Sequence, residues 1–282
     1  MPMENVLGDY QSSATRIRIL PTMTSNIDEY LQRLNYSGSI LPTAETLRQL
    51  HLAHLQNVPF ENLSIHSGEP IVLDDAALCE KIVVRRRGGF CYELNGLFAS
   101  LLRFLGFSVV KLSARVANGN GEFGPEFDHM TLMVTAPDAP QTRWLADVGF
   151  GDCFNEPLLL DSRDALEQGA RSYRLDAGED SFVLMQREGD GEWHPQYRFT
   201  LAAHDYADYA PMCHYHQTSP QSHFTKARVC TRTTPEGRIT LSELRFITTA
   251  HGERNERLLD DESAYRVALR DHFGIELKAS KT

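Results

Sequence analysis

The sequence lacks several features that would point to whole classes of protein. No run approaches the roughly 20 consecutive apolar residues of a membrane-spanning helix, so we expect no membrane span. Basic residues are outnumbered, with 28 Lys and Arg against 38 Asp and Glu and a formal net charge of −10. Proteins that bind nucleic acids or anionic membranes broadly carry a basic surface instead. We therefore expect a globular protein that binds neither nucleic acid nor a membrane.

Cysteine is scarce, and its spacing forms no pattern. The five cysteines are odd in number and scattered along the chain, unlike the paired spacings of a disulfide framework. The first residues, up to Asn26, also lack the cationic start and apolar block of a secretory signal. We interpret the cysteines as thiols in a reducing compartment and expect a cytoplasmic location.

One group of residues superficially resembles a metal site: Cys213, His214, His216 and His223. The spacing Cys-His-x-His is not a recognised closed zinc pattern, and no second cysteine pair accompanies it. We therefore predict no metal. We interpret the group as loop and strand polar residues that line a cofactor cleft.

What the sequence does contain is a change of hydrophobic period along the chain. The clearest helix is 94–105, where apolar residues recur at helical spacing before Gly106. After Gly106 the period becomes two, which predicts strands. Helices followed by strands and a mixed tail predict an α+β fold rather than alternating βαβ units. The other expected helices are 26–35, 43–56, 74–84 and 261–273. The expected strands are 108–116, 129–135, 143–148, 172–175, 181–187, 193–199, 227–233 and 238–246.

Cys91 has a setting that the other cysteines do not share. It follows Gly88-Gly89, whose flexibility lets the backbone approach a ligand closely, and it directly precedes the clearest helix. Free N–H groups and the positive end of the dipole at a helix start favour a thiolate. The three arginines at 85–87 add positive charge nearby. The alternative is a buried structural cysteine, but the setting favours a nucleophile.

His129 and Asp147 follow on two segments with strand-like patterns. An activated thiol needs a base, and the base needs a group that orients it. A carboxylate inside the apolar segment around Asp147 costs free energy unless it is paired. Taken singly, His129 fits a structural strand histidine, and Asp147 fits a carboxylate that accepts N–H bonds from the turn at Gly149. A triad of Cys91, His129 and Asp147 explains all three placements at once.

In these blocks and in others, the sequence resembles the arylamine N-acetyltransferases. The resemblance covers about residues 26–275, and its most specific part is Arg-Gly-Gly-x-Cys with the histidine and aspartate in order. The matching blocks are Pro59-Phe60-Glu61-Asn62-Leu63, Arg87-Gly88-Gly89-Phe90-Cys91-Tyr92-Glu93-Leu94-Asn95, His129, Asp147-Val148-Gly149-Phe150-Gly151, Thr218-Ser219-Pro220, Phe224 and Cys230-Thr231-Arg232-Thr233-Thr234-Pro235-Glu236-Gly237.

The resemblance implies a domain order. After an N-terminal tail at 1–25, we expect a helical bundle at 26–106 that carries the nucleophile. A β-barrel-like domain at 107–205 would carry the histidine and the aspartate, and an α/β lid would occupy 206–282. The catalytic core of this family is similar to those of papain-like peptidases and transglutaminases.

The resemblance also implies a ping-pong reaction. Cys91 would accept an acetyl group from acetyl-CoA, and an arylamine, arylhydroxylamine or hydrazine nitrogen would then attack the acetyl-cysteine while His129 accepts its proton. Phe60 and Phe150 are candidates for an aromatic acceptor pocket, with ordinary core packing as the alternative. The residues implied for coenzyme A are Gly149, Gly151, Ser219, Ser222 and Phe224.

Other functions fit parts of the same pattern. Within the family, an amide synthase that releases a carrier-bound acyl chain would use the same triad with a different acyl donor. A papain-like hydrolase would also use Cys, His and Asp, but the surrounding blocks favour the transferase. A binding protein with a dead catalytic site is disfavoured because every member of the triad is present.

Overall fold

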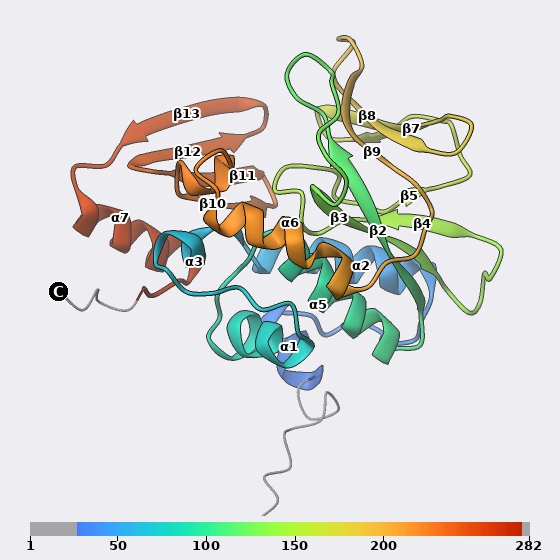
Figure 1. The fold of residues 1–282 in the computed structure, drawn as a ribbon, viewed down its shortest axis with the longest axis horizontal. Helices are drawn as coiled ribbons and strands as arrows, with labels where there is room; N and C mark the ends of the chain where they lie inside the picture. The colour runs from blue at the N-terminus through green and yellow to red at the C-terminus, as the bar shows by residue number, and fades with distance from the viewer. Residues whose placement is uncertain (1–26, 278–282) are drawn as a thin grey trace, which may run out of the picture.

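The computed structural model describes residues 27–277, and the tail expected at 1–25 lies outside them. Helices from the first third of the chain lie together, and two antiparallel sheets stand side by side against them (Figure 1). The predicted α+β fold is confirmed. The helices of the first third are α1 (Ile27–Arg33), α2 (Ala44–Asn57), α3 (Leu63–His66), α4 (Asp75–Cys79), its π-helical continuation η2 (Glu80–Val84) and α5 (Cys91–Phe104).

The N-termini of these helices are capped by residues that the sequence supplies at the right places. The Thr43 hydroxyl accepts a hydrogen bond from the Thr46 N–H at the start of α2. The Asp74 carboxylate accepts the N–H groups of Ala76 and Ala77 at the start of α4. Such caps satisfy backbone donors that have no partner inside the helix. The helices predicted at 43–56 and 74–84 are therefore confirmed within a few residues.

Helix α5 lies at the centre of the molecule. All residues of its first 12 positions, Cys91 to Leu102, are buried. It packs against β2 (Ser108–Val116) and β3 (His129–Thr135) of the larger sheet. The helix begins three residues before the apolar pattern that predicted it, so Cys91 is its first residue.

The larger sheet has eight strands and curls into a nearly closed barrel. Its order is β5-β4-β3-β2-β9-β8-β7-β6, and neighbouring strands are antiparallel. The strand predicted at 143–148 is shorter than expected: β4 ends at Ala146, and Asp147 begins the turn after it. Besides β2 and β3, its strands are β4 (Arg143–Ala146), β5 (Leu158–Leu159), β6 (Leu166–Gln168), β7 (Arg171–Ala177), β8 (Phe182–Glu188) and β9 (His194–Phe199).

The smaller sheet has five strands in the order β1-β10-β11-β12-β13. The strand predicted at 238–246 is wrong, because a two-residue turn with Glu243 at φ 49° divides it between two strands. A tight turn at 235–236 joins β10 to β11, and Thr234 pairs with Gly237 across it. The strands are β1 (Phe60–Glu61), β10 (Val229–Thr234), β11 (Gly237–Ser242), β12 (Arg245–Ala250) and β13 (Glu253–Leu258).

Helix α6 (Tyr206–Thr218) runs between the two sheets, in front of α5 (Figure 1). Its presence overturns the expectation that Cys213, His214 and His216 lie on loops and strands. Pro211 inside the helix and the lack of an apolar stripe hid it from the periodicity. The Tyr206 hydroxyl donates to Asp75, which ties α6 to α4. The short 3-10 turn η3 (His223–Thr225) follows α6.

The closing helix predicted at 261–273 is confirmed. It consists of α7 (Glu262–Ala268) and the π-helical η4 (Leu269–Phe273). Gly274 ends it in the left-handed conformation at φ 67°, which glycine adopts without steric cost.

Candidate active site

Cys91 is the first residue of α5 and lines a cavity of about 370 Å³. The start of the helix is fixed by Glu93, whose carboxylate accepts the Phe90 N–H at 3.1 Å. The Lys81 ammonium donates to the same carboxylate at 2.6 Å, so this buried charge is paired. The cysteine is therefore held rigidly, with its side chain at the wall of the cavity.

The glycines around Cys91 are explained by contacts within the chain. A Cβ on Gly88 would lie 2.0 Å from the Pro59 carbonyl oxygen, and a Cβ on Gly149 would lie 2.8 Å from the Cys91 Cα. Both distances are far below van der Waals contact. Gly149 thus lets the turn after β4 close directly onto the start of α5.

Two of the three arginines before Cys91 are paired with carboxylates and do not supply the free positive charge that the sequence suggested. Arg85 donates to Glu69, and Arg87 donates to Glu61 at 2.9 Å. These carboxylates compensate the two guanidinium groups. Burial raises the pKa of the Cys91 thiol well above its usual range, the charge of Asp147 raises it further, and a hydrogen bond with the Met130 backbone lowers it only in part. The charges of Arg85 and Arg87 are therefore directed at carboxylates, and the dominant influence on the thiol is its burial.

His129 and Asp147 meet because their strands are neighbours. His129 is the first residue of β3, and Asp147 directly follows β4, which pairs with β3. The His129 Nε2 lies 2.7 Å from the Asp147 Oδ2, and the two side chains are 3% and 0% exposed. His129 lines the same cavity as Cys91. Because Nε2 is bonded to the carboxylate, Nδ1 is the ring nitrogen that remains for the thiol.

Asp147 accepts three further hydrogen bonds. Its Oδ2 accepts the Tyr197 hydroxyl at 2.9 Å. Its Oδ1 accepts the Asn95 amide at 2.9 Å and the Gly149 N–H at 3.0 Å. Burial raises the pKa of Asp147, but the charge and hydrogen bond of His129 and the bonds from Asn95 and Gly149 outweigh it, so the pKa lies below its usual value. Asp147 is therefore a fully satisfied carboxylate.

Asn95, one helical turn after Cys91, connects the nucleophile to the other two elements. Its amide also donates to the Met130 carbonyl at 2.6 Å, and its oxygen accepts the Val148 N–H at 2.9 Å. Asn95 was not among the residues expected to form the site. The signal was available, because a polar residue four positions after Cys91 lies on the same face of the helix.

His51 and Tyr197 were missed for another reason: they come from α2 and β9, far away in the chain. The His51 Nε2 accepts the Asp147 N–H at 3.0 Å, and its Nδ1 faces the Asn155 carbonyl at 2.9 Å. Burial lowers the pKa of His51 to about 4, so it is neutral at pH 7. No local pattern marks either residue as a neighbour of Asp147.

Both phenylalanines expected to bind the acceptor line the cavity. The Phe150 ring stands edge-on to His129, with ring centroids 5.1 Å apart. The Phe60 ring lies 6.2 Å from that of Phe224, centroid to centroid. Aromatic side chains therefore form part of the wall of the cavity that Cys91 lines.

The residues expected to bind coenzyme A are placed in two groups. Gly149 and Phe224 line the cavity. Gly151 packs against the Phe60 ring, while Ser219 follows α6 and accepts the Gln221 N–H. Ser222 is buried and accepts the Phe224 N–H at 3.2 Å. These last three residues lie outside the cavity lining.

A second histidine–aspartate pair is formed by His216 and Asp128. Asp128 lines the cavity, and its Oδ1 lies 3.2 Å from the His216 Nε2. Cys213, one turn earlier on α6, contacts the Gln217 amide, and His214 is exposed. Among residues 27–277, no group of three or more His, Cys, Asp or Glu side chains is arranged to hold a metal ion. Within the same range, no helix has the length and apolarity needed to cross a membrane.

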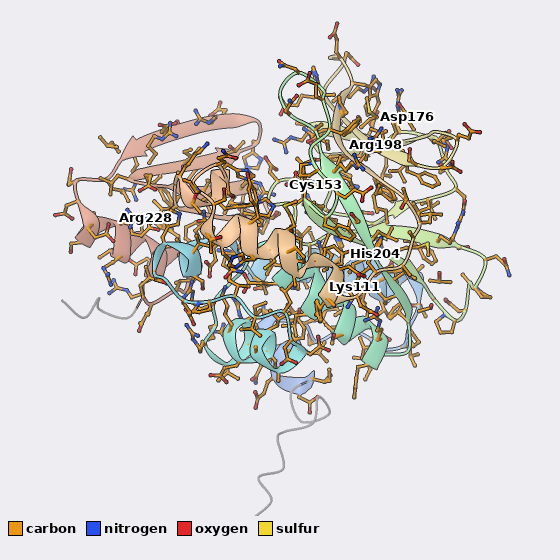
Figure 2. All side chains as sticks on the ribbon, in the orientation of Figure 1. Lys111, Cys153, Asp176, Arg198, His204 and Arg228 are labelled. Carbon is orange, nitrogen blue, oxygen red and sulfur yellow. The ribbon has the colours of Figure 1, made fainter. Side chains whose placement is uncertain are left out.

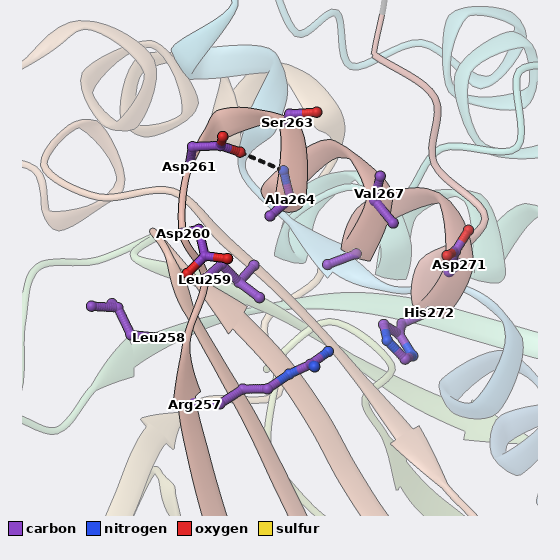
Figure 3. Close-up of a pocket in the computed structure, with 11 residues that line it drawn as sticks. Arg257, Leu258, Leu259, Asp260, Asp261, Ser263, Ala264, Val267, Asp271 and His272 are labelled. Atoms are coloured by element: carbon purple, nitrogen blue, oxygen red, sulfur yellow. Dashed lines mark hydrogen bonds between the residues drawn. The ribbon is translucent and has the colours of Figure 1, made fainter.

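A second hollow, of about 530 Å³, lies between the end of β13 and α7 (Figure 3). Arg257, Asp260 and His272 are among the residues that line it. None of the residues that the sequence marked as functional lines this hollow, so the cavity at Cys91 is the candidate active site.

Comparisons with known proteins agree with this geometry. The family model described as N-acetyltransferase matches residues 43–282. The arylamine N-acetyltransferase of Escherichia coli strain K12 is 35% identical over 262 residues, which cover 92% of each chain. The solved structure of arylamine N-acetyltransferase from Salmonella typhimurium has a TM-score of 0.84 and 34% identity, covering 91% of this chain and 93% of that one. That of the Mycobacterium marinum arylamine N-acetyltransferase in complex with CoA has a TM-score of 0.81 and 34% identity, covering 88% and 92%.

Proposed function

The chain belongs to the arylamine N-acetyltransferase family, and from this premise we propose that it transfers an acetyl group from acetyl-CoA to the nitrogen of arylamines, arylhydroxylamines or hydrazines. The reaction proceeds by a ping-pong mechanism through an acetyl-cysteine at Cys91. The observation that carries the proposal is the meeting of Cys91 and His129 in one cavity, with the His129 Nε2 bonded to Asp147 at 2.7 Å.

In the first half-reaction, the Cys91 proton passes to the His129 Nδ1. Burial disfavours ionisation of this thiol, so the thiolate forms only as the imidazole takes its proton inside the cavity. The Asp147 carboxylate holds the ring in position and stabilises the imidazolium. The sulfur attacks the thioester carbonyl, the carbon–sulfur bond to coenzyme A breaks, and His129 returns the proton to the departing thiolate.

In the second half-reaction, the neutral acceptor nitrogen attacks the acetyl-cysteine. His129 accepts the proton that the nitrogen loses and returns it to the Cys91 sulfur as the amide leaves. Backbone N–H groups near Cys91 stabilise the oxyanion in both steps. Phe60 and Phe150 enclose the acceptor ring between their aromatic faces.

Coenzyme A is proposed to bind along the turn at Gly149 and Gly151 and the loop at Ser219, Ser222 and Phe224. A relative from Mycobacterium marinum has been solved with CoA bound, which supports this cosubstrate. Gly149 and Phe224 reach the cavity and so serve the thioester end of the cosubstrate. The proposed reaction needs no metal, and the thiol state of the cysteines supports a cytoplasmic location.

Incubation with acetyl-CoA alone tests the proposal. Intact-mass measurement and peptide mapping should find one acetyl group on Cys91, together with free coenzyme A. The Cys91→Ala variant should give no adduct, while Cys213→Ala, which removes a buried thiol of α6, should still be acetylated. An adduct that survives Cys91→Ala contradicts the assignment, and coenzyme A release that requires the amine contradicts the ping-pong order.

A further inference from the structure

Asp128 places a second carboxylate in the wall of the cavity. It directly precedes His129, its side chain is 15% exposed, and it lines the cavity together with Cys91 and Phe150. The proposed transfer of acetyl groups gives this carboxylate no role. A charged group so close to the reacting atoms must either be neutralised by the protein or interact with what enters the cavity.

The backbone beside Asp128 is held in place. The Tyr92 hydroxyl donates to the Phe127 carbonyl at 2.5 Å, and the Phe127 N–H donates to the Ser113 hydroxyl at 2.8 Å. Behind the carboxylate, the side chain of His216 is only 3% exposed. The carboxylate therefore stands at a fixed position in the wall.

His216 is held in place by a hydrogen bond with Ser222. The Ser222 hydroxyl oxygen accepts the Phe224 N–H, so its own proton is free to be donated to the His216 Nδ1, 3.2 Å away. The other ring nitrogen, Nε2, lies 3.2 Å from the Asp128 Oδ1. His216 therefore contacts one oxygen of the Asp128 carboxylate from behind, and the same carboxylate lines the cavity.

The other charged and titratable groups of the cavity do not neutralise Asp128. The Arg228 guanidinium, labelled in Figure 2, is held by Glu243 and Glu262 at 3.0 to 3.2 Å. Burial lowers the pKa of His223, which favours its neutral form. Among the described residues, Asp128 has no lysine or arginine within ion-pair distance; its ionic contact is with His216. The carboxylate retains the capacity to accept hydrogen bonds from a ligand.

We propose that Asp128 selects the acceptor by charge. It binds a cationic or hydrogen-bond-donating substituent of the aromatic amine, at a position away from the reacting nitrogen, and repels a carboxylate at that position. A charge-assisted hydrogen bond in a partly buried site is stronger than one between neutral groups, and like charges there are unfavourable. This inference rests on the proposed function, because it concerns the second half-reaction at the same Cys91.

Three acceptors with one ring and different charges test the inference: 4-aminobenzylamine, p-toluidine and 4-aminobenzoate. The measured quantity is kcat/KM for each acceptor at saturating acetyl-CoA, expressed as the ratio of variant to wild type, so that the intrinsic reactivity of each amine cancels. The neutral acceptor p-toluidine serves as the reference. In Asp128→Asn, the ratio for 4-aminobenzylamine should be about tenfold lower than the ratio for p-toluidine, as expected for loss of one charge-assisted contact. The ratio for 4-aminobenzoate should be severalfold higher than the ratio for p-toluidine.

The matched control is Glu126→Gln, which removes a carboxylate two positions away. Glu126 is 65% exposed, pairs with Arg115 and does not line the cavity. Its three ratios should be equal within about twofold, because exposed charges are screened. Asp128→Glu keeps the charge and should restore part of the discrimination.

Two outcomes overturn the inference. Equal changes of kcat/KM for all three acceptors in Asp128→Asn would show that Asp128 has a structural role only. The same conclusion would follow if Glu126→Gln changed the discrimination among the three acceptors as much as Asp128→Asn does. Failure of the proposed function looks different: the wild-type protein would then form no acetyl-cysteine with acetyl-CoA. An intact acetyl-cysteine with no change in charge discrimination refutes the role of Asp128 alone.

Discussion

Two histidine–aspartate pairs flank one cavity, and their surroundings give the two carboxylates opposite properties. Asp147 is completely buried and accepts four hydrogen bonds, one of them from His129. Asp128 faces the cavity and has His216 behind it. In the first pair the histidine faces the reactants, and in the second the aspartate does. The difference lies in the number of hydrogen-bond donors that each carboxylate already binds. Asp147, with four donors, orients a base, whereas Asp128 is open to a ligand.

The largest expected effect comes from removing the negative charge of the buried pair. Asp147→Asn should lower kcat of acetyl transfer to p-toluidine by about 10³- to 10⁴-fold, because the amide no longer stabilises the imidazolium or fixes the correct tautomer. Asp128→Asn should cost at least a hundredfold less in the same assay. Steady-state rates of coenzyme A release measure both. Equal losses in the two variants would show that the two carboxylates do not differ as proposed.

The second-largest expected effect is a loss of stability at acid pH, caused by His51 behind Asp147. The pKa of His51, behind Asp147, is lowered to about 4 from 6.5 in the unfolded chain. Between these values the unfolded state binds a proton that the folded state does not, so this contribution to stability is complete above pH 6.5 and is lost as the pH falls toward 4. The loss should reach about 3 kcal/mol at pH 4, at about 1.4 kcal/mol per pH unit.

Urea unfolding at a series of pH values measures this loss. His51→Gln keeps one donor and one acceptor without titrating, so the stability of this variant should fall less steeply between pH 6.5 and 4. His214→Gln, at an exposed position of α6, should follow the wild type. A His51→Gln slope equal to that of the wild type would contradict the assignment of a neutral, buried His51.

The smallest effect concerns a single hydroxyl. Tyr197→Phe removes one of the four donors to Asp147 and should lower the free energy of unfolding by about 1.5 to 3 kcal/mol, the usual value for a hydrogen bond to a charged group. Tyr209→Phe is the matched control: the Tyr209 ring packs against Phe127, the residue before Asp128, and its hydroxyl is buried and finds no hydrogen-bond partner among the described residues. That variant should be as stable as the wild type or more so. A larger loss in Tyr209→Phe than in Tyr197→Phe would reverse the comparison.

The parts of the site that follow local rules could be predicted from the sequence. Cys91 was identified because it follows two glycines and begins a helix. Asp147 was identified because a carboxylate next to an apolar strand needs a partner. Both signals come from hydrophobic period and the cost of burying charge, which act over a few residues. His129 was found through the change of period that defines β3. These three residues lie at the same cavity or one hydrogen bond behind it.

The remaining parts depend on contacts that the chain makes only after folding. The compensation of Arg85 and Arg87 needs Glu69 and Glu61, which lie 16 and 26 positions away, so no local count of charge predicts it. Helix α6 shows no apolar stripe because it packs through single large side chains such as Tyr209. The pairing of Asp128 with His216 depended on that helix and was therefore missed as well.

The burial of α5 also determines how the gene can be divided. This helix carries Cys91 and Asn95, while the partners of Asn95 are Met130 on β3 and Val148 after β4. A cut between residues 95 and 130 therefore separates Asn95 from its partners on β3 and after β4. The two pieces of such a split chain have to reassociate along α5 before the reacting groups assemble.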